Sequence, residues 1–261
     1  MPSIPSLYRF EEAFLPVIER ADLPLQGLRL YHALHSTLSG MTRGLHLLSM
    51  SHVPDPNPVL TAELVRLFWP PGTADLRGLR EGIEAVRDTG LFAFVRLDED
   101  GRHVHARPSK SVAHACEPLR GKGFGELDAQ DARLCNSATD LLLYTRMMIH
   151  KGQLRPKFEL PKLGGEAPWT TNSMKRWERS ALWLSRLKGV DFLIQSKVCP
   201  YSGQFESVVV KITSGTTEWS HGRLYDASAK WPPLAVEDGR RLRLDRAELM
   251  RRANWREVGR P

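Results

Sequence analysis

The spacing of apolar residues predicts that the chain begins with helices. Apolar side chains recur every three or four positions over residues 6–21, which predicts a docking helix that Pro16 interrupts. A second apolar stripe predicts a helix over residues 25–38, ended by Gly40. Residues 45–50 are apolar and short enough to form a strand.

The next segment shows a helix, a tight turn, a second helix and two strands. Apolar positions predict helices over residues 61–69 and 73–89, separated by a Pro-Pro-Gly turn that no helix crosses. Strands are expected over residues 91–97 and 102–107, because both flank an acidic turn that ends in glycine. A helix-turn-helix followed by a β-hairpin is typical of a winged helix.

A similar order of elements returns in the second half of the chain. Ser137 is expected to cap a buried helix over residues 138–150, and Thr170 or Thr171 a longer helix that Gly189 ends. Further strands are expected over residues 157–160, 192–198 and 208–213. The short helix expected between the first of these strands and the long helix has no clear signal.

These elements define a fold class and a set of domain boundaries. We expect an α+β, mostly helical chain with two tandem winged-helix domains. The expected parts are an N-terminal docking helix (residues 1–22), a first winged-helix domain (23–110), a linker (111–131), a second, basic winged-helix domain (132–216) and a basic C-terminal extension (217–261). The linker loses periodicity and is rich in glycine. The extension is expected to be irregular, with one short basic helix over residues 245–252.

The chain of 261 residues carries a net charge of +7, and the distribution of this charge indicates an anionic partner. Residues 146–188 hold 10 Lys or Arg against 3 Asp or Glu, and residues 239–261 hold 8 Arg against 3 acidic residues. Residues 1–145 hold 15 basic side chains against 18 acidic ones. The positive excess therefore falls in the second predicted domain and at the C-terminal end, where it favours a nucleic acid.

On a helical wheel, the long helix of the second domain separates an apolar from a basic face. The inward face holds Met174, Trp177, Ala181 and Leu184, and the outward face holds Asn172, Lys175, Arg176, Arg179 and Arg186. In a major groove, Arg pairs with guanine and Asn with adenine, so the outward face is the predicted surface for double-stranded DNA. In the first domain, Arg77 and Arg80 stand among as many acidic side chains, which predicts a weaker DNA contact or a protein contact.

The architecture resembles that of plasmid replication initiators of the tandem winged-helix type, over about residues 23–216. The resemblance rests on the segment LVRLFWP (64–70), on the Arg-rich helix and hairpin after it, and on the more basic second module. It implies binding to repeated origin sequences in double-stranded DNA, one module for dimerisation or a second DNA contact, and recruitment of host replication proteins. We expect a homodimer that works without a cofactor.

Two other functions fit parts of the sequence. A transcriptional regulator is one, because winged helices serve promoters as well as origins and fold does not fix function. The second is a rolling-circle nicking enzyme: His103 and His105 share one face of a strand, as metal ligands do, and Tyr144 follows on a helix as a candidate nucleophile. No third ligand is evident, and Met148 stands where such enzymes carry a lysine. A non-catalytic DNA-binding protein is therefore the preferred interpretation.

Several function classes lack the sequence features that they require. No run of about 18 apolar residues and no N-terminal targeting pattern is present, so a cytoplasmic protein without membrane contact is expected. Cys116, Cys135 and Cys199 include no CxxC pair and are expected to be reduced thiols. No nucleotide-binding loop, nucleophile elbow or HExxH motif occurs, so no metal or other cofactor is predicted.

Overall fold

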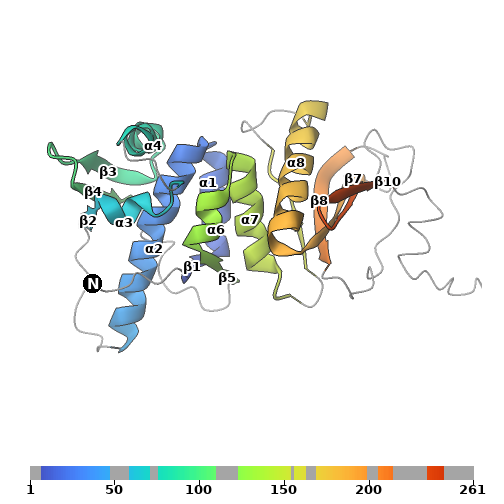
Figure 1. Cartoon of the computed structure of the whole chain (residues 1–261), viewed down its shortest axis with the longest axis horizontal. Helices are drawn as coiled ribbons and strands as arrows, with labels where there is room; N and C mark the ends of the chain where they lie inside the picture. Colours follow the sequence, from blue (N-terminus) through green and yellow to red (C-terminus); the bar gives the residue numbers. More distant parts are fainter. Residues whose placement is uncertain are drawn as a thin grey trace, which may run out of the picture. The chain divides into compact units, whose positions relative to one another are not determined.

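The structure is a computed structural model, and the residues it describes form two compact units. The described residues are 7–47, 59–70, 76–109, 123–153, 156–162, 169–198, 205–213 and 234–243. Among the described residues, the first unit runs to Ile149 and the second begins at His150. Helices and strands occur together in both units, as Figure 1 shows, so the fold class is α+β as predicted.

The chain starts with a strand where the sequence predicted a helix. Three elements span this region: β1 (Leu7–Glu11), the 3-10 helix η1 (Glu12–Phe14) and α1 (Leu15–Arg20). In β1, Tyr8 and Phe10 are buried and alternate with exposed or half-buried residues, which is the pattern of a strand. β1 pairs antiparallel with β5 (Phe124–Asp128), a partner that local spacing does not reveal. The single helix predicted over residues 6–21 is therefore wrong, and Pro16 lies in the first turn of α1, where no backbone N–H is needed.

The second helix is longer than predicted. α2 (Leu25–Leu47) continues through Gly40 and takes up the start of the strand predicted after it. A glycine costs a helix about 1 kcal/mol relative to alanine, and α2 continues through it nevertheless. α2 also lies close to α4 (Arg77–Arg87), since a Cβ atom on Gly82 would be 2.7 Å from the Gln26 carbonyl oxygen. A residue with a side chain at this position would force the two helices apart.

A three-stranded antiparallel sheet follows α2 in the first unit. Its strands and the helices between them are β2 (Val59–Thr61), α3 (Ala62–Arg66), α4, β3 (Phe92–Leu97) and β4 (His103–Pro108). The strand order is β2-β4-β3, and Gly101 closes the β3–β4 turn with a φ of 70°. The predicted hairpin is confirmed. The two predicted helices before it are shorter than expected, and residues 71–75 between them lie outside the described residues.

The first unit extends beyond the predicted linker. β5 and the start of α6 (Ala129–Leu134) fall inside residues 111–131, so this part of the linker is structured; residues 110–122 lie outside the described residues. α7 (Ala138–His150) comes next and belongs to the first unit up to Ile149. Tyr144 on α7 is fully buried, in keeping with the buried helix predicted here.

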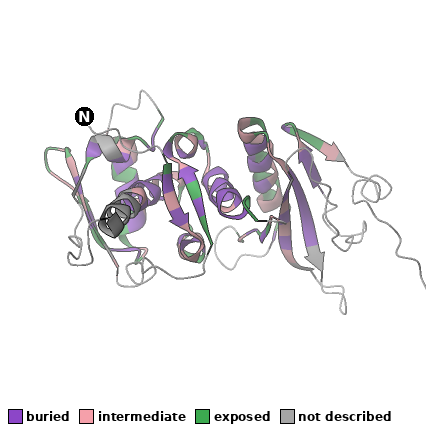
Figure 2. Cartoon of the chain, turned by 90° about the horizontal axis from the view of Figure 1, so that it is seen from below, coloured by how far each residue is buried: buried purple, intermediate pink, exposed green. Residues whose placement is uncertain are grey.

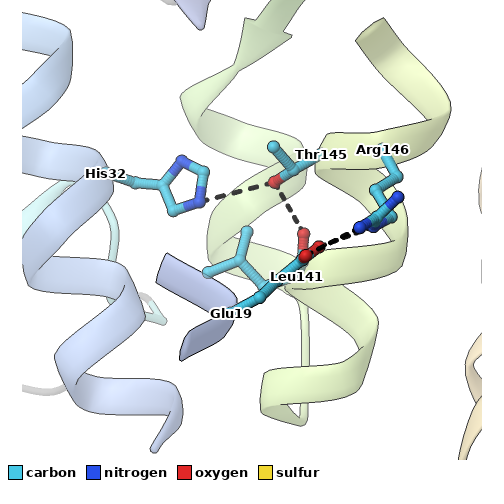
Figure 3. A network of polar contacts seen from close by, with 5 residues as sticks. All are labelled: Glu19, His32, Leu141, Thr145 and Arg146. Atoms are coloured by element: carbon cyan, nitrogen blue, oxygen red, sulfur yellow. Dashed lines mark hydrogen bonds and ion pairs between the residues drawn. The ribbon is translucent and has the colours of Figure 1, made fainter. Parts of the chain in front are cut away.

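Polar contacts join α7 to α1 and α2 inside the first unit (Figure 3). Arg146 donates two hydrogen bonds, 2.6 and 2.7 Å long, to the Glu19 carboxylate. His32 Nε2 lies 3.4 Å from Thr145 Oγ1, and that hydroxyl donates to the Leu141 carbonyl at 2.7 Å. Polar groups that are buried between helices require such partners. The division between the units therefore comes after α7 and not in the predicted linker.

The second unit places one helix on a five-stranded antiparallel sheet. Its elements are β6 (Lys157–Glu159), α8 (Thr171–Lys188), β7 (Asp191–Val198), β8 (Phe205–Thr213), β9 (Leu234–Glu237) and β10 (Arg240–Arg243), and the strand order is β10-β9-β7-β8-β6. The extension predicted to be irregular thus contains a hairpin, and its turn residues Asp238 and Gly239 have φ values of 48° and 67°. β9 pairs with β7 and adds buried Leu234 and Val236 to the sheet. The helix predicted over residues 245–252 lies outside the described residues.

The two halves of the chain share one order of elements. α2, β2, α4, β3 and β4 correspond in order to α7, β6, α8, β7 and β8. In both halves the first strand pairs with the second strand of the hairpin, β2 with β4 and β6 with β8. Figure 2 shows buried residues on the strands of both sheets. Residues 163–168, for which a short helix was expected without a clear signal, lie outside the described residues.

Candidate nucleic-acid interface

A capping box fixes the start of α8. Thr170 Oγ1 accepts a hydrogen bond from the Ser173 N–H at 3.1 Å, and Ser173 Oγ accepts one from the Thr170 N–H at 2.9 Å. Gly189 ends the helix in the left-handed conformation, with a φ of 61°. Both signals are local, and the predicted extent of this helix is confirmed.

One face of α8 packs on the sheet of the second unit. Trp177, Ala181 and Leu184 are fully buried on this face. In the sheet, Ile194 of β7 and Val210 of β8 are register partners and are buried as well. Three of the four residues predicted for the apolar face are therefore buried, and Met174 is half-buried. Their burial leaves the opposite face of α8 free to meet solvent.

Four polar residues of α8 form an exposed cluster that we name the α8 basic surface. Its members are Asn172, Lys175, Arg176 and Arg179, all of which are exposed. Residues three and four apart lie on one side of a helix, so the four side chains face the same way. Lys175, Arg176 and Arg179 make no ion pair or hydrogen bond with the described residues. These cations are therefore available to an anionic ligand.

Arg186, the fifth residue predicted for this surface, is held at the other end of the helix. Its Nε donates a 3.1 Å hydrogen bond to the Gly239 carbonyl in the β9–β10 turn. The Gly239 N–H donates in turn to Ser185 Oγ at 2.8 Å. A rise of 1.5 Å per residue places Arg186 about 10 Å along the axis from Arg179. Arg186 thus anchors the hairpin and lies outside the α8 basic surface.

The exposed face of α4 is balanced in charge, as the sequence predicts. Arg77 Nε lies 2.9 Å from the Glu81 carboxylate, and Arg87 lies 2.7 Å from the Glu84 carboxylate. Arg80, the other predicted contact residue on this helix, is exposed. Ion pairs on an exposed helix face stabilise the helix slightly and leave little net charge for a phosphate.

Exposed arginines on the β3–β4 hairpin are a feature that the sequence interpretation missed. Arg96 and Arg107 are both exposed, as is Phe94, whose side chain has a relative exposure of 39%. Phe94 is the register partner of Arg107, so the two side chains share one face of the sheet. The signal lies in the alternation along the strands, where Val95 and Ala106 are buried and their neighbours face outward.

The histidines and the tyrosine of the nicking-enzyme alternative lie in different environments. His103 Nδ1 and His105 Nε2 lie 3.2 and 2.6 Å from the two carboxylate oxygens of Asp98, in the acidic turn beside which the sequence places them. Tyr144 is buried in α7, where its hydroxyl accepts from a backbone N–H and donates to the Asp131 carboxylate at 3.0 Å. Burial raises the pKa of Tyr144, which disfavours the phenolate that a nucleophilic attack requires.

Comparison with known proteins shows a similarity of fold. No protein-family model matches the sequence, and no curated protein matches it. Among solved structures, the chain is similar to the crystal structure of Pi initiator protein in complex with iteron DNA, with a TM-score of 0.55 at 12% sequence identity. The two chains share a fold. The similarity covers 82% of this chain and 100% of that one. Within the described residues, no helix is long and apolar enough to cross a membrane.

Proposed function

We propose that the protein is a plasmid replication initiator that binds repeated sequences in the double-stranded DNA of its origin. The observation that carries this proposal is the α8 basic surface, which a capped helix presents while its other face is buried. The likeness of fold to an initiator solved with iteron DNA supports the same function.

In this proposal both halves of the chain are winged helices. α4 and α8 are the second helices of the two helix-turn-helix units, and the hairpins β3–β4 and β7–β8 are the wings. α8 enters the major groove with its N-terminal half first. There Arg176 and Arg179 reach guanine edges or phosphates, Asn172 reaches adenine, and Lys175 neutralises a phosphate.

The two units have different roles in this proposal. The charge-balanced face of α4 suits a protein contact, so the first unit serves a homodimer or a host replication protein, with Arg80 as a minor DNA contact. The exposed arginines Arg96 and Arg107 on its hairpin add contacts to phosphates. The protein acts by binding DNA and recruiting partners, without catalysis and in the cytoplasm.

The test is a gel-shift titration of the full chain with a duplex that carries the direct repeats of its own origin. Neutralisation of three phosphates by α8 predicts that affinity falls about 40-fold for a fourfold rise in salt. A scrambled duplex of equal length serves as the control. Absent or salt-insensitive binding would refute the proposal.

A replication assay separates an initiator from a transcriptional regulator. A plasmid that carries the origin should be maintained in cells only when the protein is supplied. If the protein binds the repeats but the plasmid is lost, a regulator is the better interpretation.

A further inference from the structure

The turn between β3 and β4 gathers metal-ligand side chains that DNA binding does not use. Asp98 and Asp100 in the turn and His103 at the start of β4 each offer one ligand atom, and these atoms all lie within 4.8 Å of one another. His105 reaches the same place, with its Nε2 2.6 Å from Asp98 Oδ1. Residues i and i+2 of a strand share a face, so both imidazoles face Asp98. Asp98 and Asp100 thus supply the carboxylate ligands that the histidine pattern of the sequence lacked.

Backbone hydrogen bonds hold the turn in this shape. The Asp98 N–H donates to the His103 carbonyl at 2.9 Å, and the Gly101 N–H donates to the Asp98 carbonyl at 3.0 Å. His103 is also the register partner of Thr61, so β2 fixes β4 from its other side. The ligand atoms are therefore placed by a paired hairpin before any ion arrives, which lowers the cost of ordering them.

The ligand set favours a zinc-class cation. Zinc bonds of about 2.0–2.2 Å to nitrogen and oxygen put neighbouring ligands of a tetrahedron about 3.3 Å apart. Asp98 Oδ2 and His103 Nδ1 lie 3.2 Å apart, close to that separation. The third ligand, Asp100, has a carboxylate oxygen within 4.8 Å of the other two ligand atoms, and the same carboxylate accepts a hydrogen bond from the Arg102 N–H at 3.0 Å. Imidazole suits zinc, copper and nickel ions, whereas magnesium and calcium ions prefer oxygen ligands.

We propose that Asp98, Asp100 and His103 bind one zinc-class divalent cation, and that His105 acts as a positioning residue that holds Asp98. Asp98, Glu99 and Asp100 place three carboxylates in succession, and a dication offsets their repulsion. The cation also ties the end of β3 to the start of β4. This inference does not depend on the proposed function.

Cobalt titration of the full chain tests the site. The chain is first freed of metal with a chelator, and Co²⁺ then reports its ligands through visible absorption, with Zn²⁺ as the competitor. One equivalent should bind with a nitrogen and oxygen spectrum that lacks the intense thiolate band. Asp98→Asn and His103→Gln should each abolish binding, and His105→Gln should weaken it about tenfold or more, as loss of an outer partner does.

Matched controls keep the result clear. Asp88→Asn removes an exposed carboxylate just beyond α4 in the same unit and should leave the affinity unchanged. Circular dichroism establishes that each variant is folded. The proposal is overturned if the chain binds neither ion, if a thiolate band appears, or if Asp98→Asn and His103→Gln bind as the unchanged chain does.

Discussion

The Glu178 carboxylate lies 3.1 Å from the Arg241 guanidinium, so the only acidic residue of α8 is paired with β10. Without this partner, Glu178 would offset the charge of Arg176 and Arg179, its neighbours on the same helix. The Arg241 guanidinium neutralises the Glu178 carboxylate instead. Through this ion pair, the β9–β10 hairpin keeps Glu178 from reducing the positive charge of the α8 basic surface.

The first prediction concerns the arginines of the α8 basic surface. Changing Arg176 and Arg179 together to alanine should weaken duplex binding by about 2 kcal/mol or more, which is roughly 30-fold, because two cationic side chains no longer reach phosphates or bases. Fluorescence anisotropy with the origin repeats measures the change. The salt slope should become shallower as well, by up to about 0.9 for each phosphate that the variant no longer neutralises.

Arg77→Ala with Arg80→Ala is the matched control for this pair. Both residues are exposed arginines on a helix, but Arg77 is paired with Glu81 and the face around it is balanced. The control should change affinity less than about threefold. Equal losses from the two pairs would show that α4 and α8 contact DNA alike.

The second prediction compares two glycines that have the same backbone conformation. Gly239 and Gly189 have φ values of 67° and 61°, but a Cβ on Gly239 would overlap the Arg186 side chain whereas a Cβ on Gly189 would meet nothing within 4 Å. Gly189→Ala should cost about 1 kcal/mol of stability from backbone strain alone. Gly239→Ala should cost about 1–2 kcal/mol more, because Arg186 must give way. Urea unfolding measures both, and equal losses would mean that the hairpin turn does not pack on Arg186.

α8 was predictable because its signals are local. The cap at Thr170, the stop at Gly189 and the periodic burial of Trp177, Ala181 and Leu184 all lie within one segment. The β3–β4 hairpin was predictable for the same reason, since its turn sequence and its strands are contiguous.

The missed elements depend on contacts between distant segments. β1 has an apolar spacing that fits a helix as well as a strand, and its pairing with β5 joins Leu7 to Asp128. The sequence placed α7 in the second predicted domain. In the structure, the contacts of Arg146 with Glu19 and of Thr145 with His32 join α7 to the first unit. The separation of Arg186 from the other basic residues likewise follows from a hairpin far along the chain. Spacing within a segment carries no information on such pairings.

The third prediction is a loss of stability at acidic pH that arises from His32. This side chain is fully buried, and burial, with a smaller effect of His35, lowers its pKa from 6.5 to about 3. Its hydrogen bonds fit the neutral ring: Tyr8 donates to Nδ1 at 2.8 Å, and Nε2–H donates to Thr145, whose own proton goes to Leu141. A second ring proton would face the Tyr8 hydroxyl.

The direction of the effect follows from proton binding. Between about pH 6.5 and 3, unfolded chains bind a proton at His32 that folded chains exclude. The contribution of His32 to the free energy of unfolding is therefore fully present above about pH 6.5, the pKa in the unfolded chain. It falls as the pH decreases, by up to about 1.4 kcal/mol per pH unit. Urea unfolding across this range measures the slope. His32→Gln, which keeps a donor and an acceptor, should be less stable at pH 7 but have a shallower slope; an unchanged slope would contradict the assignment.

The fourth prediction assigns Tyr144 a structural role. Its hydroxyl accepts from the Asp128 N–H at 2.8 Å and donates to Asp131 at 3.0 Å. Tyr144→Phe removes both hydrogen bonds and leaves the Asp128 N–H without this partner, which should cost about 1–3 kcal/mol of stability. Thermal unfolding measures the loss, and a variant as stable as the unchanged chain would contradict this role.

The same variant decides between duplex binding and nicking. If Tyr144 were a nucleophile, the chain would cut supercoiled origin plasmid in the presence of magnesium or manganese ions and remain attached to the cut strand through a phosphotyrosine. The burial of Tyr144 in α7 predicts neither product. Origin plasmid incubated with the chain should stay supercoiled, and Tyr144→Phe should bind the repeats as tightly as the unchanged chain at a temperature where both are folded. A nick that needs Tyr144 and leaves protein on the DNA would establish the enzyme, because a buried structural tyrosine has no route to that adduct.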